Sequence, residues 1–582
     1  MGLSGHDHID ARACLGASNC CGMSRALAAL AVRAPPAVGG IVSRAHSLRF
    51  AIDVVVGTLR VRQYAGVSSM ENASAAPSAH LSYDPARVSD MATLVLMARS
   101  ACASKYEEVA FWRKCTMQAQ RLSRDSSFAE LARFVEAVAE IGFRDDEFMY
   151  NFGDAAIELA DGIDSDTLAS TLYAHDLLKF RNDRALQKLE ESLYKHMRES
   201  RATAAGLARS LRSLARLHAA GLVNAPDPNL LEGVGRMASE HVSIFTVQQL
   251  CELLEAYRAY RIQGCRQTTA LFARIANVLA HEAATLSATQ CGIAASSYAK
   301  CRVHDEQLLV GIAGRLRNKE VRNELTPQEL VRVLYGFAKF TCQDTALLDL
   351  LSIEARRRLH LMDISLMGSS LASLAKAGVS SSVFTGRAAV QLRRTPTEAW
   401  DTASMEDLSV LAMAFAKMQA RDERLFDMIA DAMLRKPGAL NGGTCSDLIN
   451  IVHAFTKVQF QHSALFGVIA QEVLERFDEI SPQDVVKFLH AAGKVDLTLP
   501  PGLRERLAQA LKPTVVQRFG VFELLKLSTA ARRLRLETPA LETQLGAVLP
   551  NEDRGEVALC APRRPTPPKR RRKSLRKRKW TW

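Results

Sequence analysis

The chain has 582 residues, more than one hydrophobic core usually organises, so several domains or an extended array are expected. Apolar residues make up 48% and charged residues 24%, which excludes a wholly disordered, collagen-like or mucin-like chain. The net charge of +13 lies at the two ends, because residues 1–52 carry +3 and residues 563–582 carry +11. Residues 53–562 therefore carry only −1, and a uniformly basic surface is not expected.

The N-terminal segment has the composition of an import signal. Residues 11–52 contain five arginines and no acid, and the stretch after Met23 places Arg25, Leu27 and Leu30 at helical spacing. A basic amphipathic segment of this kind is typical of a mitochondrial presequence, since the membrane potential drives positive charge inward. We predict organellar targeting by residues 1–52, with Met23 as an alternative start. The mitochondrial matrix is favoured over a plastid, and the nucleus is the weakest alternative; residues 53–125 are predicted to be a linker and an N-terminal helical region.

The twelve cysteines are scattered, with no pair at zinc-binding spacing. They are expected to be mostly free, buried thiols in a reducing compartment. No apolar run reaches the length of about 18 residues that a membrane-spanning helix needs, so no membrane span is expected.

An internal repeat of about forty residues dominates the rest of the chain. Segments that start at Ser287, Thr326, Ser404, Thr444 and Ser481 align without gaps. Each starts with Ser or Thr and has Gln, Glu or Asp three residues later, which is the pattern of a helix capping box. Each segment is therefore predicted to begin a helix.

Every repeat is interpreted as two helices. In the unit from Thr326, Leu330, Val333, Leu334 and Phe337 follow helical spacing and form a buried stripe, and a second helix opens near Asp344. Neither helix can bury its stripe alone, so successive pairs must stack. The fold class is predicted to be all-α, a right-handed superhelical solenoid of about eleven helix-turn-helix repeats of 37–42 residues. It is expected to span residues 126–550, followed by a disordered basic tail over residues 551–582.

A cation recurs at one place in ten successive repeats, thirteen residues after the cap in the clearest of them. A row of cations along a groove would contact a nucleic-acid backbone, although a cation at a helix C-terminus also interacts favourably with the helix dipole. The candidates for backbone contact are Lys179, Arg216, Arg258, Lys300, Lys339, Lys376, Lys417, Lys457, Lys494 and Arg532.

Base contacts are expected at the positions two and six residues after the cap, where polar side chains vary between units. Amide and guanidinium groups can bind the edges of unstacked bases, but polar residues are also common in a first helical turn for capping alone. The candidates are Gln248, Gln328, Arg332, Asn450, Gln483 and Lys487.

The C-terminal tail is basic, rich in proline and ends in two tryptophans, so it cannot form a core. Its cations could neutralise phosphates and its indoles could stack on bases; a nuclear localisation signal is the competing interpretation. The residues concerned are Arg563, Arg564, Lys569, Arg570, Arg571, Arg572, Lys573, Arg576, Lys577, Arg578, Lys579, Trp580 and Trp582.

A capped helix that ends in (F/Y/L)-A-K, followed by D-x-x-L-(L/F) and I-A, resembles the octotricopeptide and heptatricopeptide repeats of organellar RNA-binding proteins. These families are related in style to the FAST-kinase-like proteins. The resemblance covers roughly residues 126–550 and implies a role in organellar RNA processing, stability or translation, or in a mitochondrial ribosome. No RAP domain, in which a nuclease-like activity would be sought, is recognisable after the repeats.

The sequence contains no nucleotide-binding, hydrolase or zinc-protease motif, so no enzyme activity, cofactor, metal or small-molecule substrate is expected. His453 and His490, both nine residues after a cap, are interpreted as sharing a groove position. The predicted function is binding of organellar mRNA or rRNA, with ribosomal proteins as further partners. The alternative is a protein-binding scaffold of the HEAT or armadillo kind in the cytosol or nucleus.

Overall fold

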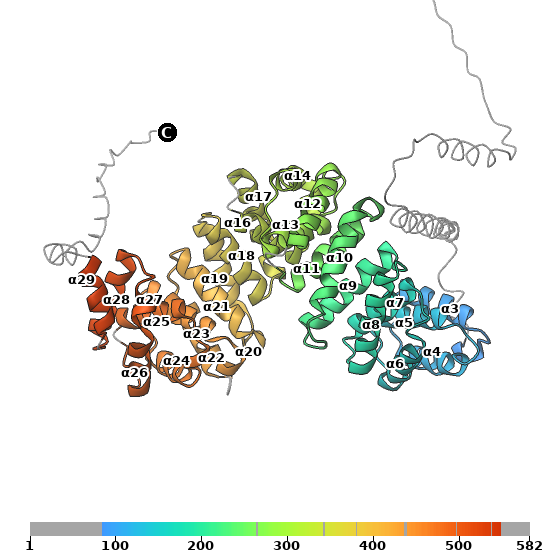
Figure 1. The fold of residues 1–582 in the computed structure, drawn as a ribbon, viewed down its shortest axis with the longest axis horizontal. Helices are drawn as coiled ribbons and strands as arrows, with labels where there is room; N and C mark the ends of the chain where they lie inside the picture. Colours follow the sequence, from blue (N-terminus) through green and yellow to red (C-terminus); the bar gives the residue numbers. More distant parts are fainter. Residues whose placement is uncertain are drawn as a thin grey trace, which may run out of the picture. The chain divides into compact units, whose positions relative to one another are not determined.

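The structure is a computed structural model that describes residues 84–262, 266–340, 344–379, 381–435, 439–495, 497–536 and 538–548. These residues belong to one compact unit, Pro77–Trp582. They contain α-helices and short 3₁₀ helices but no strand (Figure 1). The predicted targeting segment and basic tail lie outside the described residues.

The helices alternate between two layers, which we call the A and B helices. The A helices are α3 (Met91–Ala103), α5 (Phe128–Glu140), α7 (Ser165–Leu178), α9 (Ala204–Ala219), α11 (Val247–Ala259), α13 (Ala288–Cys301), α16 (Pro327–Lys339), α18 (Ile364–Lys376), α21 (Met405–Lys417), α23 (Cys445–Lys457), α25 (Pro482–Lys494) and α28 (Val521–Arg533). Each A helix packs on the next A helix along the chain. The A helices therefore form one continuous layer in this unit.

The B helices pack beside them and complete the hairpins. They are α4 (Val109–Leu122), α6 (Asp146–Leu159), α8 (Asp183–Arg198), α10 (Pro228–Glu240), α12 (Arg266–His281), α14 (Glu306–Leu316), α17 (Thr345–Arg357), α19 (Ser382–Arg394), α22 (Glu423–Leu434), α24 (Ser463–Glu475), α26 (Pro501–Ala510) and α29 (Pro539–Val548). The hairpins from α5–α6 to α28–α29 confirm the predicted all-α solenoid of about eleven repeats. The α3–α4 hairpin packs on α5 and adds one more hairpin before residue 126.

Short elements that the sequence analysis missed join some B helices to the next A helix. They are α15 (Lys319–Glu324), α20 (Thr397–Thr402), α27 (Pro513–Val516), η3 (Val242–Ile244), η4 (Leu359–Leu361), η5 (Ala439–Gly442) and η6 (Phe477–Glu479). Because these linkers differ in length, the N-caps from Ser127 to Gly520 lie 37 to 43 residues apart, slightly more than predicted.

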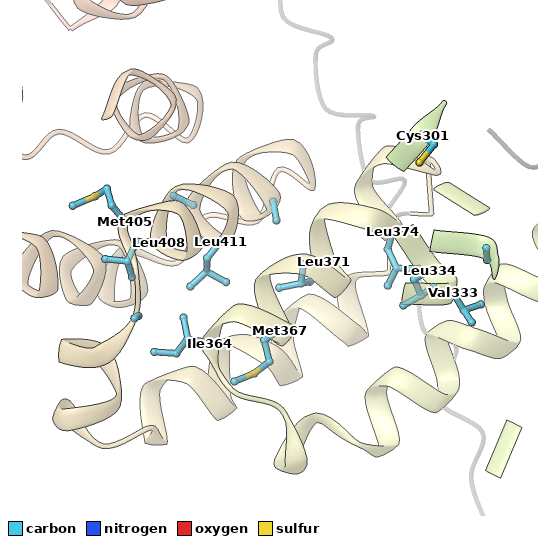
Figure 2. Close-up of a cluster of buried hydrophobic side chains, with 14 of the residues drawn as sticks. Cys301, Val333, Leu334, Ile364, Met367, Leu371, Leu374, Met405, Leu408 and Leu411 are labelled. Atoms are coloured by element: carbon cyan, nitrogen blue, oxygen red, sulfur yellow. The ribbon is translucent and has the colours of Figure 1, made fainter. Parts of the chain in front are cut away.

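The helix starts and the buried stripes follow the repeat pattern. Full capping boxes form at Ser287, Thr326, Ser404 and Thr444, while Ser481 caps its helix with its own side chain. The predicted stripe of α16 is fully buried. Figure 2 shows how such stripes meet, with the apolar side chains of α18 lying between those of α16 and α21.

Small residues let neighbouring A helices approach closely. A Cβ atom added to Gly336 on α16 would lie 2.7 Å from the backbone carbon of Ala295 on α13. One added to Gly493, the small residue before a repeat lysine, would lie 2.8 Å from the Cα of Ala530 on α28. Real Cβ atoms essentially never approach this closely, so these glycines set the spacing of the A layer.

The substitution Gly336→Ala is therefore expected to lower the free energy of unfolding by about 1–3 kcal/mol, because the new methyl group overpacks the α13–α16 contact. Gly314→Ala on α14 is the matched control, since its added Cβ meets nothing within 4 Å. The free energy of unfolding of this control should rise by up to about 1 kcal/mol, because alanine has a higher helix propensity than glycine. Urea denaturation followed by circular dichroism measures both, and equal stabilisation of the two variants would contradict the close approach.

Candidate nucleic-acid interface

One face of helix α16 stays accessible while the others are buried. On α16 the accessible side chains include Gln328, Arg332, Tyr335 and Lys339, which lie two, six, nine and thirteen residues after the cap. This spacing corresponds to a single helix face. Base candidates two and six residues after a cap and lysines thirteen residues after it therefore share one face of their helix, together with the position of His453 and His490.

Five lysines occupy the last residue of five successive A helices, from α16 to α25. We call them the lysine row; its members are Lys339, Lys376, Lys417, Lys457 and Lys494. Lys339 is half-exposed and the other four are exposed. With the residues that the structure describes, their ammonium groups form no hydrogen bond or ion pair. The alternative in which they cap terminal carbonyls is thus not seen, although the favourable position relative to the helix dipole remains.

The members of the row lie within electrostatic reach of one another. The pKa of Lys376 is lowered by burial and by the positive charges of Lys339 and Lys417. Burial also lowers the pKa of Lys494, with further contributions from Lys526, Lys457 and Arg533. Successive repeats thus hold like charges close together with no acid paired to them in the described part of the chain, which favours binding of a polyanion.

The basic positions of the repeats before α13 are paired with acids of the protein. Lys179 Nζ lies 2.6 Å from Asp176 Oδ1, and Arg216 lies 3.5 Å from the other oxygen of the same buried carboxylate. Lys179 also departs from the predicted position, because it follows its cap Asp164 by fifteen residues and forms the left-handed C-cap of α7. Its alignment with the repeat lysines is therefore wrong.

The buried carboxylate of Glu255 on α11 forms ion pairs with four arginines. Its side chain is only 6% exposed and lies within 4 Å of guanidinium nitrogens of Arg212, Arg216, Arg258 and Arg332. Burial and the charge of Arg332 lower the pKa of Arg258 to about 10. Two of the backbone candidates, Arg216 and Arg258, thus belong to an internal cluster that joins α9, α11 and α16.

The end of the row also differs from the prediction. Arg532 follows the N-cap Gly520 of α28 by twelve residues and donates a hydrogen bond to Ser528. Arg533 is the residue at thirteen, and it contributes to the lowered pKa of Lys494. Arg533 rather than Arg532 therefore continues the lysine row. Lys300 lies at the predicted place, with its ammonium 5.7 Å from the ring centre of Tyr335.

Most base candidates contact other protein groups. Lys487 Nζ lies 3.0 Å from Asn450 Oδ1 in the preceding repeat, and Gln248 donates a hydrogen bond to Glu252. Arg332 belongs to the Glu255 cluster. Gln328 and Gln483 are exposed. The structure therefore brings all six onto one face, and a role in base contact stays a prediction for each.

His453 and His490 lie next to each other on successive A helices. Their ring centres lie 6.4 Å apart on α23 and α25. The pKa of His453 is lowered to about 4 by burial, by the neighbouring imidazole and by three lysines. The pKa of His490 is also lowered to about 4, by burial and by two lysines. Both rings are thus neutral at physiological pH and offer flat surfaces beside the lysine row.

Sequence analysis missed an exposed aromatic residue on the same face. Phe522, two residues after the Gly520 cap, is 70% exposed, and Lys526 Nζ lies 4.0 Å from its ring centre. Phe522 occupies the same repeat position as Gln328 and Gln483. The sequence of α28 differs too much from the other repeats for the start of this helix to be placed, so the equivalence could not be recognised. An exposed ring beside cations is a suitable surface for stacking a base.

The remaining expectations concern groups away from this face. The six described cysteines are free, and five of them are buried. Among the described residues, no cluster of side chains suits a metal ion and no helix has the length and apolarity to cross a bilayer. All tail residues predicted to bind RNA lie outside the described part of the chain.

The fold and its row of cations define an all-α helical-repeat protein with a candidate polyanion-binding face. Residues 228–499 match the model of a family described as "RNA-editing substrate-binding complex 6 protein". The chain is thus similar to this family over somewhat less than half its length, and the match includes the whole lysine row. No curated protein matches the chain. The match agrees with the resemblance at the level of an RNA-associated helical protein, and it does not extend to octotricopeptide, heptatricopeptide or RAP domains.

Proposed function

We propose that the protein binds single-stranded RNA along the A layer and serves in organellar RNA processing without chemistry of its own. The observation that carries this proposal is the lysine row, five ammonium groups at one place in consecutive repeats that have no partner among the described residues. Phosphates spaced along a strand are the natural counterions for such a row. The exposed ring of Phe522 and the rings of His453 and His490 add surfaces on which bases could stack.

The internal pairing of charges suggests where the strand lies. The repeat cations before α13, which are Lys179, Arg216 and Arg258, are already paired with Asp176 or Glu255. From α16 onward the five lysines of the row have no acid partner within the described residues. We therefore place the RNA on the A helices from α16 to α28.

The matched family supports the substrate class and the setting. Its printed name refers to a complex that binds RNA-editing substrates, so we propose that this chain joins a multiprotein RNA-processing complex. The basic, acid-free segment over residues 11–52 supports a mitochondrial location. A place on the mitochondrial ribosome is the second assembly consistent with RNA binding.

Crosslinking in isolated mitochondria, followed by sequencing of the RNA bound to the full chain, tests this function. We expect recovery of mitochondrial RNA, with contacts concentrated on residues 327–533. Sedimentation would separate an editing-type complex from a ribosome. Recovery of protein partners without RNA would instead support a HEAT-like scaffold and would reject the proposal. RNA that is shortened by the purified chain, with or without divalent metal, would contradict a purely binding role.

A further inference from the structure

A cleft of about 480 Å³ lies on the B layer, between α17, η4 and α19. One face of α19 forms much of its lining through Val383, Arg387, Val390 and Arg394, which follow helical i, i+4, i+7, i+11 spacing. The B helices carry no member of the lysine row. The cleft is therefore a surface that the proposed RNA face does not use.

The floor of the cleft is apolar and partly open to solvent. Val383 is 52% exposed and Val390 is 40% exposed, and both lie near the buried Leu359. Two further aliphatic side chains of the same elements are exposed, Ile353 on α17 and Leu361 on η4. Exposed aliphatic groups gathered in a concave surface are typical of a binding site.

The rim of the cleft is positively charged. Arg356, Arg387 and Arg394 line it, no acid does, and these three arginines form no ion pair or hydrogen bond with the described residues. Adjacent arginines behave differently, because Arg357 pairs with Glu354 and Arg393 pairs with Asp422. Among the arginines of α17 and α19, the three that line the cleft are the ones with no ion pair to the described residues.

We propose that this cleft binds a partner protein through a short acidic segment that carries bulky aliphatic side chains. Carboxylates would pair with the arginine rim, and aliphatic groups would cover Val383 and Val390. The chain's own ends are unsuitable occupants, since residues 1–52 and 563–582 are both basic. RNA suits the cleft less well, because no aromatic side chain that could stack on a base is among the lining residues apart from His360.

Gly386 provides a way to block the cleft without disturbing the fold. It lines the cleft within α19, and a Cβ added there meets nothing within 4 Å. Gly386→Phe should therefore fill the cleft, and replacing a helical glycine does not weaken the helix. Gly467→Phe on α24 is the matched control, because that exposed helical glycine also faces open space outside the cleft.

The test uses the full chain and a fluorescent peptide of Asp, Glu, Leu and Ile, with binding followed by anisotropy. Gly386→Phe is expected to weaken binding at least about tenfold, and Gly467→Phe should leave it within about twofold. The charge-reversed pair Arg387→Glu and Arg394→Glu should prefer a peptide in which Lys replaces the acids. Circular dichroism confirms that each variant is folded.

Four results would overturn the inference. The first is equal binding by the wild type and Gly386→Phe, and the second is equal binding of a peptide in which Ser replaces Leu and Ile. The third is displacement of the peptide by oligouridylate together with loss of RNA affinity in Gly386→Phe, which would make the cleft part of a nucleic-acid surface. The fourth is self-association that Gly386→Phe abolishes, which would identify a second copy of the chain as the occupant.

Discussion

Replacing the five lysines of the row with glutamine is expected to lower the affinity for single-stranded RNA by about 10³ at a salt concentration of about 0.15 M. Each phosphate that a lysine neutralises releases counterions and contributes about 0.7 to the slope of log K against log salt. If every row lysine contacts one phosphate, the variant loses about 3.5 from this slope. A titration series over several salt concentrations measures both quantities.

Two controls separate the row from general electrostatics and from the basic tail. The double variant Lys417→Gln, Lys457→Gln should lose about tenfold in affinity, whereas Lys319→Gln, Lys512→Gln, at two lysines outside the row, should change it less than about twofold. Equal losses in the two pairs would contradict a specific path for the strand. Deleting residues 563–582 measures how much the tail contributes to the RNA affinity and to its salt dependence. A slope that depends on the tail alone would remove the row from the RNA site.

Glu255→Gln is expected to lower the free energy of unfolding by about 3–5 kcal/mol, the usual cost of removing one partner from a buried ion pair. Glu255 is the shared counterion of four guanidinium groups, and its side chain is 6% exposed. Glutamine preserves shape and hydrogen-bonding capacity but leaves the arginines to repel one another. Urea denaturation, combined with hydrogen exchange of α9, α11 and α16, measures the global and local loss.

The stability difference caused by Glu255→Gln is expected to depend on pH. Burial by itself raises the pKa of Glu255, but Arg216, Arg212, Arg258 and Arg332 outweigh burial and the pKa lies below its ordinary value. A carboxyl with a lowered folded pKa contributes stability above its unfolded pKa of about 4.3, and this contribution is lost as pH falls through the folded value. The difference in the free energy of unfolding between the wild type and Glu255→Gln should therefore become smaller below about pH 4. The exposed ion pair of Arg421 and Glu423 is the control, and Glu423→Gln should cost less than about 1 kcal/mol at any pH.

Much of the candidate site could be predicted because it follows the repeat. The cap at Thr326, the buried stripe that ends in Phe337 and the lysine at position 339 are local features of one helix, and helical periodicity relates them directly. At α28 the N-cap is a glycine, which has no capping side chain that would mark the start of the helix in the sequence. For this reason Gly520 was missed and Arg532 was assigned in place of Arg533.

The sequence by itself determined the fold class, the hairpin repeat, the helix that carries each cation and the neutral character of the array between two basic ends. Only the tertiary structure decided which cations are available. Arg216 and Lys457 are equivalent in the repeat, yet Arg216 is held by Asp176 and Glu255 whereas Lys457 has no acid partner among the described residues. The same holds for the cleft beside α19, where Arg393 is paired and Arg394 is not. The physical reason is that pairing depends on side chains from helices one or two repeats away, and periodicity within a single helix carries no information about them.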